Sequence, residues 1–121
     1  MRDAVIAKIA ASESLEQAEL AGIDLRGFDL HAADFRKANL SQAKLNGANL
    51  QAANLSEANL RAAHLSQANL ADANLSSANL VWTNLRGANL SGADLHEAIY
   101  DNTTILPEHF DPEAAGMVLV E

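Results

Sequence analysis

The side chains that most often perform chemistry are scattered through this sequence without a recognisable catalytic or metal-binding spacing. The four histidines are His31, His64, His96 and His109, and none has a second ligand at the spacing that zinc sites use. The chain has no cysteine, which excludes thiolate metal sites and a cysteine nucleophile. It also has no glycine-rich phosphate loop, no supported Ser-His-Asp set and no paired carboxylates in an evident pocket. We therefore predict a protein that is not an enzyme, with no catalytic residue, cofactor or metal.

A repeat of five residues organises the chain around these side chains. From Leu20 to Leu95 every fifth residue is Leu, except Phe35, and in most repeats Ala stands two residues earlier and Asn or Asp one residue earlier. In an α-helix one repeat advances by about 140° around the axis, so the leucines would spread over all sides. In one long strand they would alternate between the two faces, because five is odd. The chain must therefore change direction within every repeat.

Each repeat is predicted to be a very short strand followed by a turn. In a three-residue extended piece, Ala and Leu share the inward face while Asn or Asp points outward, where stacked amides can form ladders. The remaining two residues form the corner, and five glycines occupy its second position, where a type II turn needs a positive φ. Other corners carry Gln, Ala, Ser, Glu or Trp82 there, so we expect some corners to adopt another turn type. Such units coil into a solenoid.

Departures from the repeat indicate four sides to each coil. Lys44 and His64 both stand at the Asn position, 20 residues apart, and Thr83 and Thr103 both stand at the Ala position with the same separation. A four-sided coil stacks each pair in one column, whereas a three-sided coil scatters them. Asp24, Lys44 and His64 then lie about 4.8 Å apart, where they could form an ion-pair ladder at the surface.

The run "ANLSQAKLNGANLQAANLSEANL" resembles the pentapeptide-repeat family. The Asn-rich repeats and the closing segment "TTILPEHFDPEAAGMVLVE" look like its small cyanobacterial members. The resemblance covers about 80 of the 121 residues. It implies an all-β solenoid, a right-handed quadrilateral β-helix, here of about four 20-residue coils.

The two ends are predicted to be capped, and residues 1–121 to form a single domain. Residues 1–14 form the N-terminal cap with a short helix from about Asp3 to Ala11, residues 15–105 form the repeat β-helix, and residues 106–121 form the C-terminal cap. Residues 15–22 read either as repeat or as a helix extension. In "DPEAAG", Asp111 is the expected N-cap of one helical turn.

Two apolar segments are candidates for contact with a partner. Val81 and Trp82 replace small or polar corner residues, with Ala62 one coil below, so they form either a partner contact or a lone aromatic lying along the wall. The C-terminal tail either packs on the last coil or pairs with another copy of the chain; its residues are Met117, Val118, Leu119 and Val120.

The acidic charge of the chain argues against binding to nucleic acid or to an anionic membrane. The net charge is −8, but residues 15–97 hold nine acids and six bases, a net of −3, and residues 98–121 hold five acids and no base. Neither part offers the basic patch that such partners require. The sequence has no signal-peptide pattern and no apolar run near the roughly 18 residues of a spanning helix, so we expect a cytoplasmic protein.

These observations leave two principal functional hypotheses. The first is a non-catalytic structural or protein-interaction module with an unidentified protein partner, present as a monomer or a weak homodimer. The second comes from the resemblance, because some members of the family are acidic DNA mimics that bind DNA gyrase. That function requires a stripe of carboxylates along the axis, and the repeats carry few. Ice binding has little support, because the outward positions form no threonine ladder.

Overall fold

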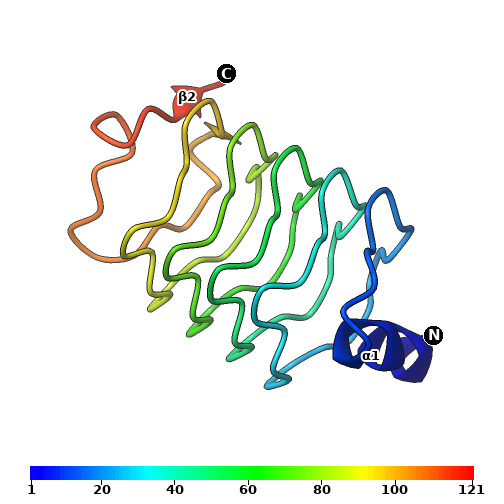
Figure 1. Ribbon diagram of the computed structural model, residues 1–121. Coiled ribbons are helices and arrows are strands. Elements are labelled where there is room, and N and C mark those ends of the chain that lie inside the picture. The colour runs from blue at the N-terminus through cyan, green and yellow to red at the C-terminus, as the bar shows by residue number, and fades with distance from the viewer.

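The computed structural model describes residues 1–121 and shows the chain wound into a stack of coils, with the two termini at opposite ends (Figure 1). One helix, α1, spans Arg2–Ala10, and two short strands, β1 (Ile99–Tyr100) and β2 (Val118–Leu119), pair at the far end. Between them the coils are joined by single parallel bridges. The bridges from Glu19↔Asn39 to Asn79↔Ile99 all have the same sequence separation, which equals four repeats. One coil therefore has four sides, each made by one repeat.

All the corners of the stack share one backbone conformation. The second corner residue has a positive φ in every repeat from Gln17 to Glu97, whether it is Gly47 (φ 67°) or Ala52 (φ 59°). The first corner residues do not, and each turn closes with a bond such as Ala53 N–H to the Leu50 carbonyl, 3.0 Å, as in a type II turn. The expectation of mixed turn types is wrong.

Stacking explains why residues other than glycine accept this conformation. From Gln17 to Ser77 the N–H of each second corner residue donates to the carbonyl of the first corner residue of the next coil, as Ala52 does to the carbonyl of Ala71 at 2.9 Å. A positive φ costs an ordinary residue about 1–2 kcal/mol. The inter-coil hydrogen bond and the burial of the adjacent Leu offset that strain, so the register of the stack overrides local preference.

The core is a narrow column of Leu and Ala inside the coils. The central side chain of each repeat from Leu25 to Leu85 is fully buried, and Phe35 fits the column without exposure. Burying one such side chain contributes roughly 1.5–3 kcal/mol before entropy is subtracted. The one buried polar residue, Thr83, donates its hydroxyl to the carbonyl of Leu60 at 2.7 Å. The interior is thus filled along its length.

At the N-terminal end α1 is followed directly by the first repeat. Residues 15–22 belong to the repeat, because Leu15 N–H donates to the carbonyl of Asp34 at 2.9 Å and Ala18 N–H closes a turn on Leu15. The helix predicted over residues 3–11 lies at Arg2–Ala10, and its buried residue, Val5, packs against the core.

At the other end the register slips by one residue. Asn84 pairs with Ile105, one position further along the chain than the spacing of the other bridges predicts, so one extra residue is accommodated before this strand. The predicted stacking of Thr103 on Thr83 is therefore wrong. Thr104 takes that place and donates its hydroxyl to the carbonyl of Leu80 at 2.8 Å, whereas Thr103 is exposed.

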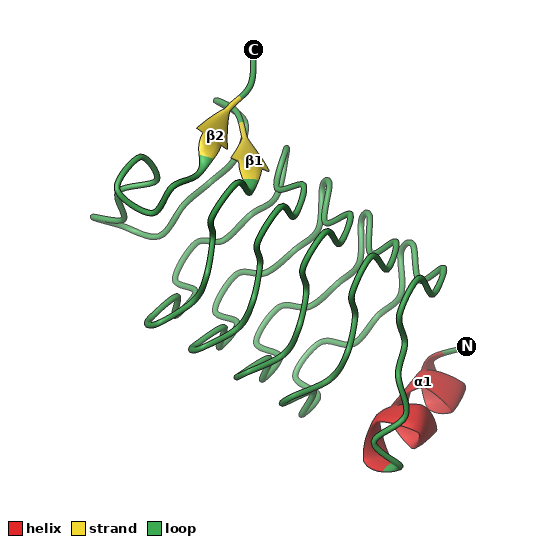
Figure 2. Ribbon diagram, turned by 45° about the horizontal axis from the view of Figure 1, so that its top comes forward, coloured by secondary structure: helices red, strands yellow, loops and turns green.

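The C-terminal tail packs on the last coil. Asp111 Oδ1 accepts the N–H groups of Glu113 and Ala114, as expected of an N-cap, and the turn ends at Gly116. Met117 is buried, and β2 then runs parallel to β1 (Figure 2). Of the predicted self-association tail, Val118 and Leu119 remain exposed, while Val120 N–H is bonded to the carbonyl of Tyr100 at 2.8 Å.

Candidate functional site

The outward Asn and Asp side chains mainly hold the corner that follows them. In most repeats the side-chain oxygen accepts the backbone N–H two residues later, as Asn74 Oδ1 does from Ser76 at 2.9 Å. The predicted amide ladder is present only in part and is longer, for example 3.4 Å between Asn59 and Asn39. The outward Asn therefore mainly caps the next corner, and some of these side chains also hydrogen-bond to the Asn of the neighbouring coil.

This capping bond is missing at Lys44 and His64, where the repeat has neither Asn nor Asp. Lys44 and His64 have no carbonyl oxygen to offer, and the backbone N–H groups of Asn46 and Ser66 find no acceptor in the protein. In the same column of corners, Arg26 N–H bonds to Asp24 at 3.2 Å and Arg86 N–H bonds to the Asn84 side chain at 3.0 Å. We call the pair of uncapped corners, with Lys44, His64, Asn46 and Ser66, the Lys44–His64 gap.

The predicted ion-pair ladder along Asp24, Lys44 and His64 is not formed. Asp24 instead receives the guanidinium of Arg26, with Nη2–Oδ2 2.7 Å and Nε–Oδ1 2.9 Å. That bond, more than the neighbouring charge of Lys44, holds the pKa of Asp24 well below its usual range. Arg26 is in the same corner as Asp24 and reaches it more easily than Lys44 does from the next coil. The Lys44 ammonium therefore remains without an ion-pair partner.

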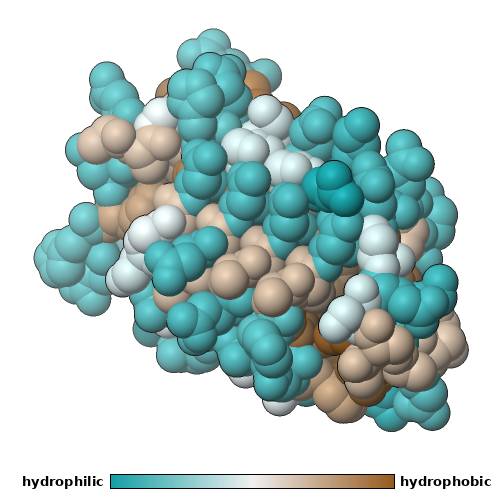
Figure 3. Space-filling model, in the orientation of Figure 1, coloured by the Kyte–Doolittle hydropathy of each residue, from teal (hydrophilic) through white to brown (hydrophobic).

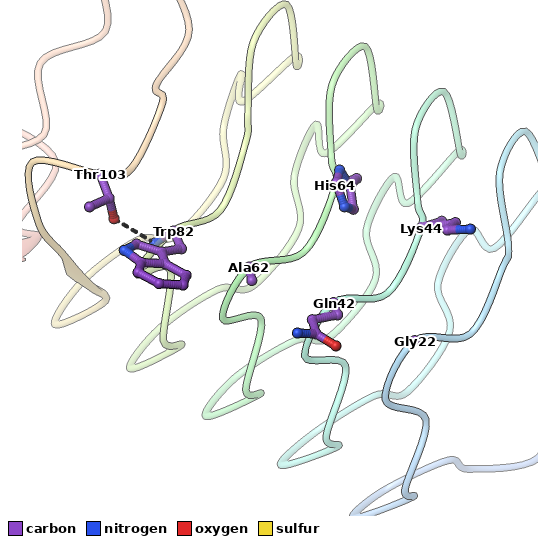
Figure 4. Close-up of a pocket in the computed structure, with 7 residues that line it drawn as sticks. All are labelled: Gly22, Gln42, Lys44, Ala62, His64, Trp82 and Thr103. Atoms are coloured by element: carbon purple, nitrogen blue, oxygen red, sulfur yellow. Dashed lines mark hydrogen bonds between the residues drawn. The ribbon is translucent and has the colours of Figure 1, made fainter.

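A shallow groove runs along the coil axis beside the gap, and we call it the Trp82 groove. It is lined by one corner column and by the neighbouring outward column (Figure 4); its residues are Gly22, Gln42, Lys44, Ala62, His64, Trp82 and Thr103. A second hollow, which shares Lys44 and His64 with the groove, is lined also by Arg26 and Asn46. The gap therefore opens onto the groove.

Trp82 projects into this groove from a fixed backbone. The backbone N–H of Trp82 donates to the hydroxyl of Thr103 at 3.0 Å (Figure 4). The indole ring lies 5.0 Å from the guanidinium carbon of Arg61 in a cation–π contact. The side chain is nevertheless 56% exposed. The hydroxyl of Thr103 also donates to Asp101, and this bond lowers the pKa of the Asp101 carboxyl. The charge of Arg61 lowers the same pKa further.

Val81 does not belong to the exposed surface that the sequence suggested. Its exposed fraction is only 6%, and its corner position lies between those of Arg61 and Asp101 in the coils on either side. The candidate contact is therefore Trp82 without Val81.

The other histidines bind only to residues near them in sequence. His31 Nδ1 lies 2.9 Å from Asp29, whose pKa this bond lowers, and His96 and His109 each lie beside an adjacent glutamate at 3.5 and 3.4 Å. The fold brings no group of three His, Asp or Glu side chains together as metal ligands would be. On the face shown in Figure 3 the coils expose mainly hydrophilic residues, with narrow hydrophobic bands between them. The helix of the structure is neither long nor apolar enough to span a membrane.

Comparison with known proteins agrees with this geometry. Residues 14–51 and 53–92 match the family model for pentapeptide repeats, in eight copies. A solved pentapeptide repeat protein from Nostoc PCC 7120, alr5209, is 41% identical over 98% of this chain and 94% of its own, with a TM-score of 0.50. Another, Rfr23 from the cyanobacterium Cyanothece 51142, is 36% identical over 74% of this chain and 61% of its own, with a TM-score of 0.74. No curated protein sequence matches significantly.

Pentapeptide repeat proteins are structural repeat proteins that fold as right-handed β-helices, which is the architecture that the regularly spaced parallel bridges describe. The family model covers well over half of the chain, and the relative from Nostoc extends the similarity to nearly all of it. The chain belongs to the pentapeptide repeat family.

Proposed function

We propose that this protein is a non-catalytic binding module that contacts a protein partner through the Trp82 groove. The observation that carries the proposal is the position of Trp82, the single tryptophan of the chain, held by Arg61 and Thr103 yet 56% exposed in a groove. Tryptophan and arginine are the residues most enriched where binding energy concentrates in interfaces. The other exposed large hydrophobic side chains lie at or near the ends of the chain.

The remaining architecture serves this surface as a rigid support. In this proposal the chain is a quadrilateral β-helix of about four coils, closed by α1 at one end and by residues 106–121 at the other. A solenoid needs such caps because its terminal coils otherwise expose both core and unpaired backbone. Met117 and Val5, both buried against the core, are the residues that support closure.

The distribution of carboxylates favours this function over a DNA mimic. A mimic needs acidic side chains in successive coils of one column, at the spacing of stacked strands. The outward columns begin with an acid and continue mainly with Asn, as in Asp29, Asn49, Asn69 and Asn89. No column of the repeats places carboxylates in two consecutive coils. We therefore do not propose gyrase as the partner.

Affinity capture from a lysate of the source cells tests the proposal. Wild-type protein and Trp82→Ser serve as baits, and Gln51→Ser is the matched control, an exposed corner residue outside the groove. We expect a protein that wild type and Gln51→Ser recover and that Trp82→Ser loses by about tenfold or more, the loss expected for an aromatic anchor. An identical set of proteins with all three baits would overturn the proposed contact.

A further inference from the structure

We propose that the Lys44–His64 gap is a carboxylate-binding subsite for an Asp or Glu side chain of an extended acidic segment of a protein partner. The inference deepens the proposed function and rests on it, because the gap opens onto the Trp82 groove.

The gap contains two backbone N–H groups without an acceptor in the protein. In the rest of this column the N–H of the first corner residue is satisfied by a carboxylate or amide oxygen, from Asp24 or Asn84. At Asn46 and Ser66 that oxygen is missing from the chain, and both N–H groups stand at the corner position that an Asn at position 44 or 64 would cap. A carboxylate from a partner supplies the kind of acceptor that the neighbouring corners receive from their own side chains. The third uncapped corner, at Ala21, follows Glu19 and has no neighbouring uncapped corner in its column.

The two donors are suitably placed for one carboxylate. Asn46 and Ser66 occupy the same position in adjacent coils, so their N–H groups are about 4.8 Å apart. The two oxygens of one carboxylate can accept one bond from each. No side-chain oxygen of the chain accepts from these two N–H groups; Asn46 Nδ2 donates to Ser66 Oγ at 2.9 Å.

Charge around the gap is the opposite of the charge of the chain. The whole protein carries −8, whereas four of its eight basic residues surround the gap and the groove: Arg26, Lys44, Arg61 and Arg86. Two acids lie among them, Asp24 and Asp101. Asp24 is already paired with Arg26, so the ammonium of Lys44 is free for a ligand. A local positive field favours an acidic segment and disfavours a basic one.

The length of the groove suits an extended peptide. Trp82 stands two coils beyond Lys44 in the stack, about 10 Å along the axis, which an extended segment of about three or four residues spans. Alternate side chains of such a segment point to the same face. An acidic side chain in the gap thus places an apolar side chain of the same segment near the ring of Trp82.

A titration followed by nuclear magnetic resonance tests the subsite directly. The probe is the peptide acetyl-Glu-Ser-Leu-Ser-Leu-amide, whose Glu and Leu side chains share one face when it is extended, and its matched control replaces Glu by Gln. We expect the amide protons of Asn46 and Ser66 to move downfield and to saturate with the Glu peptide, and to stay unchanged with the Gln peptide. In the double variant Lys44→Asn with His64→Asn, each new Asn caps its own corner, so binding should weaken about tenfold or more.

The variant Lys37→Asn is the control for charge, since it makes the same substitution at an exposed corner outside the groove. It should bind the Glu peptide as the wild type does. Equal binding by the double variant would overturn the subsite, and so would equal shifts with the Glu and Gln peptides. Inorganic phosphate is the third probe: if it saturates the same two amides while the Glu peptide does not, the peptide ligand is wrong.

The two proposals fail in different ways. If Trp82→Ser loses its partner in the capture experiment but the Glu peptide leaves Asn46 and Ser66 unmoved, the carboxylate subsite alone is wrong. If the amides respond to the peptide but no captured protein depends on Trp82, the proposed contact of the groove is wrong while the subsite remains.

Discussion

At the scale of single residues, the corner conformation shows how the stack overrides local preference. Ala52 and Ala53 are neighbours, but Ala52 is an exposed corner residue with φ 59° and Ala53 is a fully buried core residue. The same substitution at these two positions should therefore have opposite effects. Glycine relieves strain at the first and removes packing at the second.

We predict that Ala52→Gly raises the free energy of unfolding by about 0.5–1 kcal/mol, because glycine reaches a positive φ without strain. Ala53→Gly should lower that free energy by about 1 kcal/mol or more, through lost packing and greater freedom of the unfolded chain. Urea unfolding followed by circular dichroism measures both changes. A loss of stability in Ala52→Gly would show that the corners are not strained.

The paired carboxylates make stability depend on pH. Asp34 is bound by Arg36, with Nη2–Oδ2 2.7 Å, and accepts the hydroxyl of Ser14, so its pKa lies well below the usual range. A carboxyl with a lowered pKa in the folded state contributes fully above the unfolded pKa of about 3.9, and the contribution declines as the pH falls toward the folded pKa. Asp24, Asp29 and Asp101 are shifted in the same direction.

We therefore predict that the urea midpoint falls as the pH is lowered from about 6 to about 3, because the unfolded state binds more protons there. Asp34→Asn keeps an oxygen to cap Arg36 N–H but cannot titrate, so its midpoint should change less over the same range. A wild type and variant with the same pH dependence would contradict this role of Asp34.

At the scale of elements, the sequence predicts the fold wherever its repeat is regular. The five-residue period and the matching positions of Lys44 and His64 predict the four-sided coil, because the same spacing recurs in every repeat. The slip of register before Ile105 could not be predicted, because an extra residue cannot be detected in a segment that does not follow the repeat. The burial of Val81 was also missed, because it depends on the neighbours in two other coils.

The uncapped N–H groups in the Lys44–His64 gap were within reach of the sequence. Lys44 and His64 stand out as departures from the repeat, but the role expected for the outward Asn is an amide ladder between coils, which leaves out its local capping bond. The local bond from Asn to the residue two positions later is typical of Asn before a turn. Applied to each repeat, that rule points to Asn46 and Ser66 directly.

The tail provides the prediction at this scale. Met117 is only 7% exposed, whereas Leu119 in β2 is 56% exposed. Met117→Ala should therefore lower the free energy of unfolding by about 2 kcal/mol or more, and Leu119→Ala should change it by less than about 0.5 kcal/mol. Urea unfolding compares the two variants. A larger effect at Leu119 would mean that the exposed face of β2, and not Met117, holds the tail.

At the scale of the whole molecule, the regular repeats and their exceptions have different tasks. The repeated Leu, Ala and Asn residues build a solenoid with a core filled by Leu and Ala. The exceptions on one side lie along one groove; they are Lys44, His64 and Trp82. At Lys44 and His64, two backbone N–H groups are left without an acceptor in the protein. We infer that these three residues serve binding and do not stabilise the fold.

The stability of the double variant Lys44→Asn with His64→Asn tests this claim most directly. Each Asn restores the capping bond that the other repeats possess, and a hydrogen bond of this kind contributes about 0.5–1.5 kcal/mol. We predict that urea unfolding of the double variant gives a higher free energy of unfolding than that of the wild type, by about 1–3 kcal/mol for the two bonds. An unchanged or lower free energy would contradict it, because Lys44 and His64 would then serve the fold itself.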